Sequence, residues 1–285
     1  MFILVLILYV FLLSAPSDFP AGSVFHLSRG ETTGSAADDL SGMHAIRSTF
    51  LFKGFVWLFS FGQMRIIEGY YALDGRQDVV QVAWRMTHAD FATTRVKVTI
   101  PEGRNDNEIG DIMENTLPDF DENAFLSFVA ANDLQGYLFP DTYFLIPGES
   151  AADITKTMQD NFSAQVAPLA PEIEKSGHSE ADIITFASIL EREGNSTTSM
   201  AIISGILWKR LSINMALQVD SDPWTYTHRG LPVSPIANPG LAAIEAALHP
   251  IKTQYLYFLT DKNGGMHYAE TLDEQTANKL KYLKG

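Results

Sequence analysis

The stretch Ser179–Gly194, SEADIITFASILEREG, decides the fold of the larger part of the chain. Ser179 is followed three residues later by Asp182, the pattern of a capping box at the start of a helix. The apolar residues that recur at helical spacing after this start are Ile183, Ile184, Phe186, Ala187 and Leu190. The stretch therefore predicts a helix that turns one apolar face toward a core.

Two carboxylates, Glu191 and Glu193, close this apolar run. At about 100° per residue they lie on opposite edges of the apolar stripe. A carboxylate at the rim of an apolar face is partly desolvated, which raises its pKa and suits a general acid near neutral pH. A solvated helix end is the more ordinary alternative, and helix geometry alone does not choose between the two residues.

Composition narrows the class of protein. With 285 residues, 46% of them hydrophobic, the chain can form one large domain or two small ones with a sizeable core. A net charge of −14 argues against a nucleic-acid partner and leaves a neutral, sugar-like substrate open. Cysteine is absent and no histidine pair has zinc-ligand spacing, so we expect no disulfide, metal or cofactor.

The segment Met1–Leu13 is wholly apolar but shorter than the roughly 20 residues that span a bilayer, and it lacks the basic start of a secretory signal. It fits a membrane anchor that lacks its first residues, a signal segment cleaved near Ser14 or Ala15, or a buried core element. The break at Pro16 and Pro20 favours an anchor and a linker. The first two interpretations place the remainder outside the cytoplasm.

Further along, residues 21–89 predict a small mixed module whose helix 48–59 is either packed on both sides or in contact with a membrane. Residues 134–145 predict a strand, turn and strand rich in aromatics, which suit a core or a sugar-binding groove. Three prolines within residues 230–240 predict a rigid extended loop before a helix. Residues 255–269 predict a hairpin.

Five stretches, in this order, resemble one family, the endolytic murein transglycosylases (MltG or YceG-like proteins). They are VTIPEG (98–103), GYLFPDTY (136–143), ASILERE (187–193), GLPVSPIANPGLAAIEAALHP (230–250) and YLYFLTDKNGGMHY (255–268). Each alone is a weak signal, but the ordered set is specific and covers most of residues 95–285. The apolar start and the small module also match, because the family has one membrane anchor and a LysM-like subdomain.

The resemblance implies an α+β protein in three parts: residues 1–15 as anchor or signal segment, residues 16–92 as a LysM-like subdomain, and residues 93–285 as a YceG-like catalytic domain. It implies a single-pass protein of the cell membrane whose catalytic part lies outside the cytoplasm. The implied partners are peptidoglycan glycan strands and the membrane, with cell-wall synthesis enzymes left open.

The resemblance also implies a lyase chemistry. Family members cut β-1,4 bonds between N-acetylmuramic acid and N-acetylglucosamine within glycan strands, without water, and leave a 1,6-anhydro end. The first glutamate of ASILERE, Glu191, takes the catalytic role. An ordinary glycosidase needs two carboxylates. Here the substrate's own C6 hydroxyl is the nucleophile, so one glutamate can serve as acid and then as base.

Polar residues in segments that match family motifs are candidates for lining the substrate groove. They are Gln218, Asp220, Tyr226 and Asn238. For each of them, satisfying a loop backbone is an equally good interpretation.

The chain departs from the family pattern at two places. Gln135 stands where the family usually has glutamate, and only Ser221–Trp224 separate Asp220 from Thr225. Asp222 could replace Asp220 in the match, and we prefer Asp220. The short connection predicts a more open groove. An inactive, membrane-tethered peptidoglycan-binding protein and a lysozyme-like hydrolase are the alternative functions.

Overall fold

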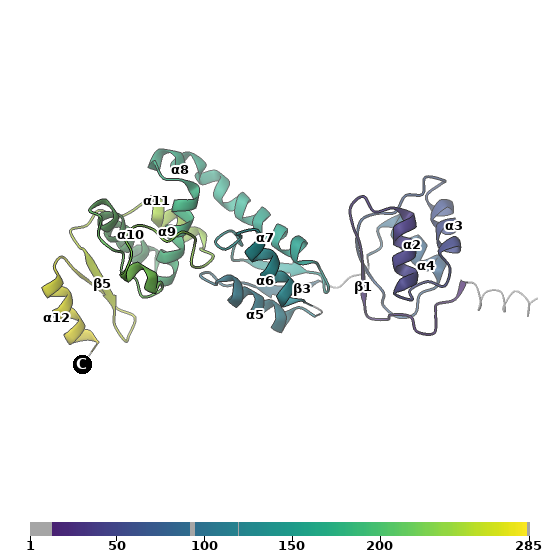
Figure 1. The fold of residues 1–285 in the computed structure, drawn as a ribbon, viewed down its shortest axis with the longest axis horizontal. Coiled ribbons are helices and arrows are strands. Elements are labelled where there is room, and N and C mark those ends of the chain that lie inside the picture. Colours follow the sequence, from purple (N-terminus) through teal and green to yellow (C-terminus); the bar gives the residue numbers. More distant parts are fainter. Residues whose placement is uncertain (1–12, 92–94, 119, 284–285) are drawn as a thin grey trace, which may run out of the picture. The chain divides into compact units, whose positions relative to one another are not determined.

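The protein is described by a computed structural model that covers residues 13–91, 95–118 and 120–283 (Figure 1). The predicted anchor segment lies outside these residues except for its last positions. The chain divides into two compact units, of which the first holds residues 1–97, 117–120 and 144–149 and the second holds the rest. Within the described ranges, no helix has the length and apolar character needed to cross a membrane.

In its described residues, the first unit consists of a two-stranded antiparallel sheet and three helices. Its elements are β1 (Val24–Leu27), α2 (Thr33–Gly42), α3 (Thr49–Phe59), β2 (Gly69–Ala72) and α4 (Val79–His88). Val24 pairs with Ala72 and Leu27 with Gly69, so the two strands run antiparallel over their full length. The side chains of Ser48 and Asp78 cap the starts of α3 and α4 by accepting backbone N–H bonds.

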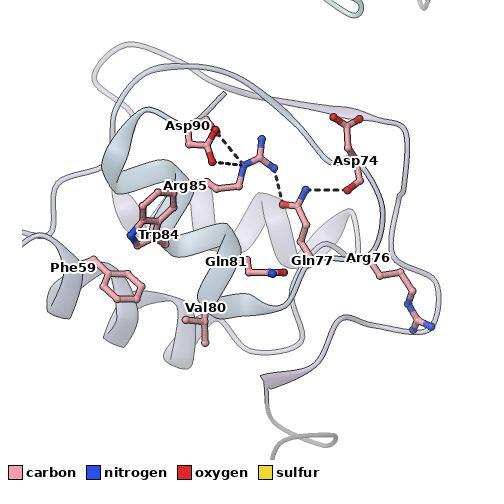
Figure 2. Close-up of a pocket in the computed structure, with 9 residues that line it drawn as sticks. All are labelled: Phe59, Asp74, Arg76, Gln77, Val80, Gln81, Trp84, Arg85 and Asp90. Carbon is pink, nitrogen blue, oxygen red and sulfur yellow. Dashed lines mark hydrogen bonds and ion pairs between the residues drawn. The ribbon is translucent and has the colours of Figure 1, made fainter. Parts of the chain in front are cut away.

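A buried arginine, Arg85, ties α4 to the end of β2, and Figure 2 shows its bond to Gln77. Arg85 Nη1 donates to the Ala72 carbonyl at 2.6 Å and to Gln77 Oε1 at 2.7 Å, and its Nη2 donates to the Phe91 carbonyl at 2.8 Å. Because every bond ends on an oxygen fixed by the fold, the burial of this charge is compensated. A pocket of about 570 Å³ opens beside Arg85 and is lined by Phe59 and Trp84 among others.

The second unit is mainly helical. Its elements are α5 (Asp106–Thr116), α6 (Glu122–Ala131), α7 (Ala151–Val166), η2 (Ala167–Leu169), α8 (Ala170–Ser176), α9 (Glu180–Glu193), α10 (Thr197–Ser212), η3 (Pro223–Tyr226), α11 (Leu241–Leu248), β5 (Tyr257–Thr260), β6 (Met266–Ala269) and α12 (Leu272–Tyr282). The strands β3 (Val96–Thr99) and β4 (Thr142–Leu145) pair with each other. The mixed α and β content agrees with the predicted fold class.

Helix α9 lies at the centre of the second unit's core and packs against α10 and α11 (Figure 1). It starts at the predicted capping box, with Ser179 and Asp182 each binding the other's backbone N–H. The prediction of a single apolar face is wrong, because every residue of 183–190 is buried. The polar side is covered by the proline-rich loop, whose Ile236 N–H donates to Ser188 Oγ at 3.0 Å.

The predicted strand–turn–strand over residues 134–145 is half right. Only Thr142–Leu145 forms a strand. The N–H groups of Gly136 and Leu138 instead donate to the side-chain oxygen of Asn238, at 2.8 and 2.9 Å. A distant side chain therefore takes the bonds that a neighbouring strand would need. The C-terminal hairpin is confirmed, with Thr260 opposite Met266.

Candidate active site

Glu191, in the last turn of α9, is held against two loops. Its Oε2 accepts the backbone N–H of Gly240 at 2.9 Å. On another side its Cγ lies 3.2 Å from the position that a Cβ on Gly103 would take, so the loop after β3 packs directly on it. The side chain is partly buried. Glu191 is thus fixed by the protein and still reachable from solvent.

A second carboxylate, Glu102, lies beside Glu191. A Cβ at Gly240 would collide with the Glu102 carboxylate, so Glu102 packs on the same glycine whose N–H binds Glu191. Arg192 fixes this loop by donating to the Gly103 carbonyl at 2.9 Å. The two acids therefore flank Gly240 at the end of α9.

The surroundings of Glu191 favour its protonated form. Burial raises the pKa of Glu191 above the usual carboxyl value, the Gly240 N–H opposes that rise, and the negative charge of Glu102 adds to it. The net direction is upward. A carboxylic acid that keeps its proton toward neutral pH can act as a general acid.

The side chain of Asn238 holds the loops around this site together. It is almost fully buried, at 1% exposure. Its Oδ1 accepts the N–H groups of Gly136 and Leu138, and its Nδ2 donates to the Arg104 carbonyl at 3.0 Å and to Asp106 Oδ1 at 3.1 Å. Both the oxygen and the nitrogen of the amide are therefore hydrogen-bonded within the protein. This fits the alternative interpretation of Asn238, in which it satisfies the backbone of neighbouring loops instead of lining the groove.

These bonds, together with the bond from Gly240 to Glu191, bring four of the five family-like stretches to one place. The Asn238 backbone binds the loop after β3 twice, through Gly103 N–H at 3.0 Å and the Arg104 carbonyl at 2.9 Å. Gln135 donates to the Pro235 carbonyl at 2.5 Å, joining the aromatic loop to the proline-rich loop. Gly136, with φ of +94° and Pro235 against its Cα, occupies a position that excludes side chains.

Glu193 faces a different loop from Glu191. Its Oε1 accepts the N–H of Ser221 at 3.0 Å. It lines a pocket of about 370 Å³ together with Gln218, Asp220 and Tyr226. Three of the four predicted groove residues thus gather around Glu193, while the fourth, Asn238, supports the loops around Glu191.

The polar residues that line the pocket beside Glu193 are held by contacts within the protein. Tyr226 Oη donates to Asp220 Oδ1, and this bond, with burial, raises the pKa of the tyrosine to about 12. Arg210, buried in α10, donates to the Leu256 carbonyl at 2.6 Å and stacks over the Tyr257 ring at 5.2 Å. The pocket therefore offers hydrogen-bonding groups and aromatic surface of the kind that sugars bind.

The short connection after Asp220 folds as a closed turn. Asp222 caps η3 by accepting the Trp224 N–H at 3.1 Å. Thr225 is fully buried and binds Val219 N at 3.0 Å through its hydroxyl. Asp222 is used by the backbone whereas Asp220 lines the pocket, which supports the preference for Asp220.

Two residues of the site, Glu102 and Arg210, were not predicted from the sequence. Glu102 stands inside VTIPEG, one of the quoted family-like stretches, so a signal existed. Arg210 sits in the last turn of α10, where a basic residue has a local explanation as a helix-dipole partner. Its pocket role is visible only when residues 210, 226 and 257 are brought together.

The fold and the gathered loops place this chain in a known class. A profile of the YceG-like family matches residues 25–223 and 221–281, and the chain belongs to that family. A crystal structure of a YceG-like protein from Listeria monocytogenes shares the fold, with a TM-score of 0.58 and 24% identity over 90% of this chain and 98% of that one.

Curated relatives carry the name endolytic murein transglycosylase. The Bacillus subtilis (strain 168) protein is 34% identical over 194 residues, covering 60% of this chain and 54% of the relative. A Streptococcus pneumoniae protein (serotype 2, strain D39 / NCTC 7466) is 24% identical over 244 residues, covering 65% and 44%. The chain spans about half the length of the curated relatives it matches.

Proposed function

We propose that this protein is an endolytic peptidoglycan lytic transglycosylase, a lyase that cuts β-1,4 bonds between N-acetylmuramic acid and N-acetylglucosamine within glycan strands. The observation that carries the proposal is Glu191: a partly buried carboxyl with a raised pKa, held by the Gly240 N–H beside the Glu102 carboxylate. The names of the curated relatives support the same activity.

The reaction needs one proton carrier. Protonated Glu191 gives its proton to the glycosidic oxygen as the bond from that oxygen to C1 of the muramic residue breaks. The C6 hydroxyl oxygen of the same residue bonds to C1, and its proton passes to the Glu191 carboxylate. The product is a 1,6-anhydro end, the glutamate regains its proton, and no water is consumed. The nearby negative charge of Glu102 stabilises the positive charge that develops at C1.

The pocket with Gln218, Asp220 and Tyr226 provides a place for sugars on the other side of the α9 terminus. We infer that a glycan strand crosses this terminus, with its scissile bond at Glu191 and neighbouring sugars in the pocket. Asn238 acts in this proposal by fixing the loops around Glu191.

Glu193 is the competing acid, because it shares the pocket with three of the groove candidates. Under that alternative, Glu191 is a buried structural carboxyl bound to Gly240. A lysozyme-like hydrolase and a non-catalytic glycan-binding protein are the alternatives at the level of function. The first gives a reducing end and the second gives no cleavage.

We further propose that the protein is a single-pass membrane protein with its catalytic part outside the cytoplasm, anchored by the apolar Met1–Leu13. The β1–α2–α3–β2 order of the first unit supports a LysM-like subdomain there. Peptidoglycan is the partner in this proposal, and contacts with cell-wall synthesis enzymes would follow from the shared location.

Mass spectrometry of peptidoglycan digested by the purified full chain tests the function. We expect 1,6-anhydro ends at internal positions of the strands. Reducing ends instead would identify a hydrolase, and an unchanged glycan would identify a binding protein.

The variants Glu191→Gln and Glu193→Gln separate the two candidate acids. Gln keeps the shape and the acceptor oxygen but delivers no proton, so Glu191→Gln should lower the cleavage rate by roughly 10²–10⁴-fold. Glu193→Gln keeps the bond from Ser221 N–H and should lose much less. If the two effects are reversed, Glu193 is the acid; if both variants cleave normally, the α9 terminus is not the catalytic element.

A further inference from the structure

Helix α3 of the first unit has apolar residues on its outer side as well as in the core. Phe52 and Val56 are fully buried in the unit's core. Phe50 is 81% exposed and Trp57 57% exposed, and they lie about two turns apart on one side of the helix. Leu58, beside Trp57, and Phe61, just past the helix end, are also exposed. These four residues are called the α3 outer face below.

Exposed apolar side chains in such a row have a function more often than single ones do. Exposing the aromatic rings of Phe50, Trp57 and Phe61 to water is unfavourable, and burying them against another apolar phase is favourable. The row lies on a regular helix whose start is capped by Ser48, so its geometry is set before any partner arrives.

Charge points to the nature of that partner. From Leu40 to Ile67 the chain has no aspartate or glutamate, although its net charge is −14. The same segment contains three basic residues, Arg47, Lys53 and Arg65. An aromatic face on a basic segment matches the interface of an anionic bilayer, where Trp and Phe enter the headgroup boundary and cations meet lipid phosphates.

The first described residues of the chain, Leu13 to Ala15, contact the first unit near the start of α3. Arg47, next to the cap of α3, donates to the carbonyls of Ser14 and Ala15 at 3.0 and 3.1 Å. Leu13 packs against the core of the unit. Residues 13–15 are therefore fixed to the start of α3 by direct contacts.

We propose that the α3 outer face is a membrane-docking surface that lies in the interface of an anionic lipid bilayer. The proposal rests on the membrane anchoring proposed above. Docking by α3 adds a second contact beside the anchor and holds the first unit against the bilayer instead of leaving it tethered at one point.

Tryptophan fluorescence tests the contact in the full chain. The protein is reconstituted in vesicles of phosphatidylcholine and phosphatidylglycerol, with and without bromine on the acyl chains, which quenches only residues that enter the bilayer. We expect quenching that disappears in Trp57→Phe and persists in the matched control Trp84→Phe, the other exposed tryptophan of the unit. The double variant Phe50→Ser/Phe61→Ser should lose most of the Trp57 quenching, and its melting temperature should stay unchanged because both side chains are exposed.

Equal quenching in the wild-type protein and in Trp57→Phe would overturn the proposal. So would protection of Trp57 from aqueous iodide without quenching by brominated lipid, which would identify a protein partner or a second copy as the occupant. Flotation of the same vesicles reports the anchor separately. Cleavage of soluble glycan fragments by the double variant, expected to be normal, separates a failure of docking from a failure of the proposed enzyme.

Discussion

At the scale of single residues, the catalytic proposal depends on a balance around Glu191. Burial and the charge of Glu102 favour the protonated carboxyl, while the Gly240 N–H favours the ionised one. Burial is the largest of the three influences, so the pKa of Glu191 lies above the usual carboxyl value. The Gly240 N–H thus orients the side chain while the net shift of its pKa stays upward.

Glu102→Gln is expected to move the pH profile of cleavage toward acid. The general acid must be protonated, so activity falls as pH rises through the pKa of Glu191. Removing the neighbouring negative charge lowers that pKa, and the alkaline limb of kcat/KM should shift to lower pH. The pH dependence of glycan cleavage by both proteins measures the shift.

Glu108→Gln is the matched control for this change. Glu108 is also a carboxylate near the end of α9, but it is paired with Arg192 at 3.2 Å instead of facing Glu191. Its loss should leave the alkaline limb in place. An unshifted profile in Glu102→Gln, or an equal shift in both variants, would contradict the role given to Glu102.

The raised pKa of Glu191 also has a consequence for stability. The folded state holds this proton more tightly than the unfolded state does, so the contribution to stability is full at low pH. It is lost as the pH rises from the ordinary carboxyl value through the folded pKa. Glu191→Gln removes the ionising group, so urea unfolding should find it at least as stable as the wild-type protein at neutral pH. Lower stability there would mean that the ionised carboxylate is favoured by the fold.

At the scale of elements, the site is made by three loops that lie far apart along the chain. The loop after β3, the aromatic loop before β4 and the proline-rich loop before α11 meet at Asn238, through bonds to Gly136, Leu138 and Arg104. The partners are 100 to 134 positions away along the chain, and one side chain joins all of them. A local change at this residue therefore affects every loop around Glu191.

Asn238→Ala is expected to destabilise the protein by about 3 kcal/mol, because it leaves buried N–H groups of Gly136 and Leu138 without an acceptor. The free energy of unfolding in urea measures this loss. Asn132→Ala, at an exposed helix end with one bond to the Phe128 carbonyl, should change stability by no more than about 0.5 kcal/mol. Equal losses of unfolding free energy in the two variants would show that Asn238 does not hold the loops together.

At the scale of the whole molecule, the two units carry different surfaces. The first contains the apolar α3 outer face, and Leu13 packs against its core. The second contains Glu191 and the pocket beside Glu193. This division is consistent with the activity and the membrane location proposed above.

The full-length protein is expected to fractionate with membranes, with residues from about 17 onward facing outward, because the apolar Met1–Leu13 precedes a proline-rich break. The chain has no cysteine, so Val233→Cys, at a 99% exposed position, introduces a single thiol. A maleimide that does not cross membranes should label it in cells whose inner membrane is intact. Recovery of an uncleaved soluble cytoplasmic protein, or labelling only after lysis, would contradict this orientation.

The sequence by itself was enough to predict the start of a helix, a turn and the family of the protein. The capping box at Ser179 and Asp182 lies within a few residues of the helix that it starts, and the turn at residues 263–265 joins the strands on either side of it. The family followed from five ordered stretches, and the family profile confirms it. These features were predictable because caps, turns and periodic apolar patterns act between near neighbours.

The tertiary structure alone decided what surrounds each of these residues. It buried α9 on all sides, replaced the first half of the predicted strand–turn–strand over residues 134–145 by bonds to Asn238, and put Glu102 beside Glu191. It also gathered Gln218, Asp220 and Tyr226 around Glu193. The physical reason is that desolvation, charge–charge interaction and long-range hydrogen bonds depend on distance in space, and the packing of remote segments sets that distance.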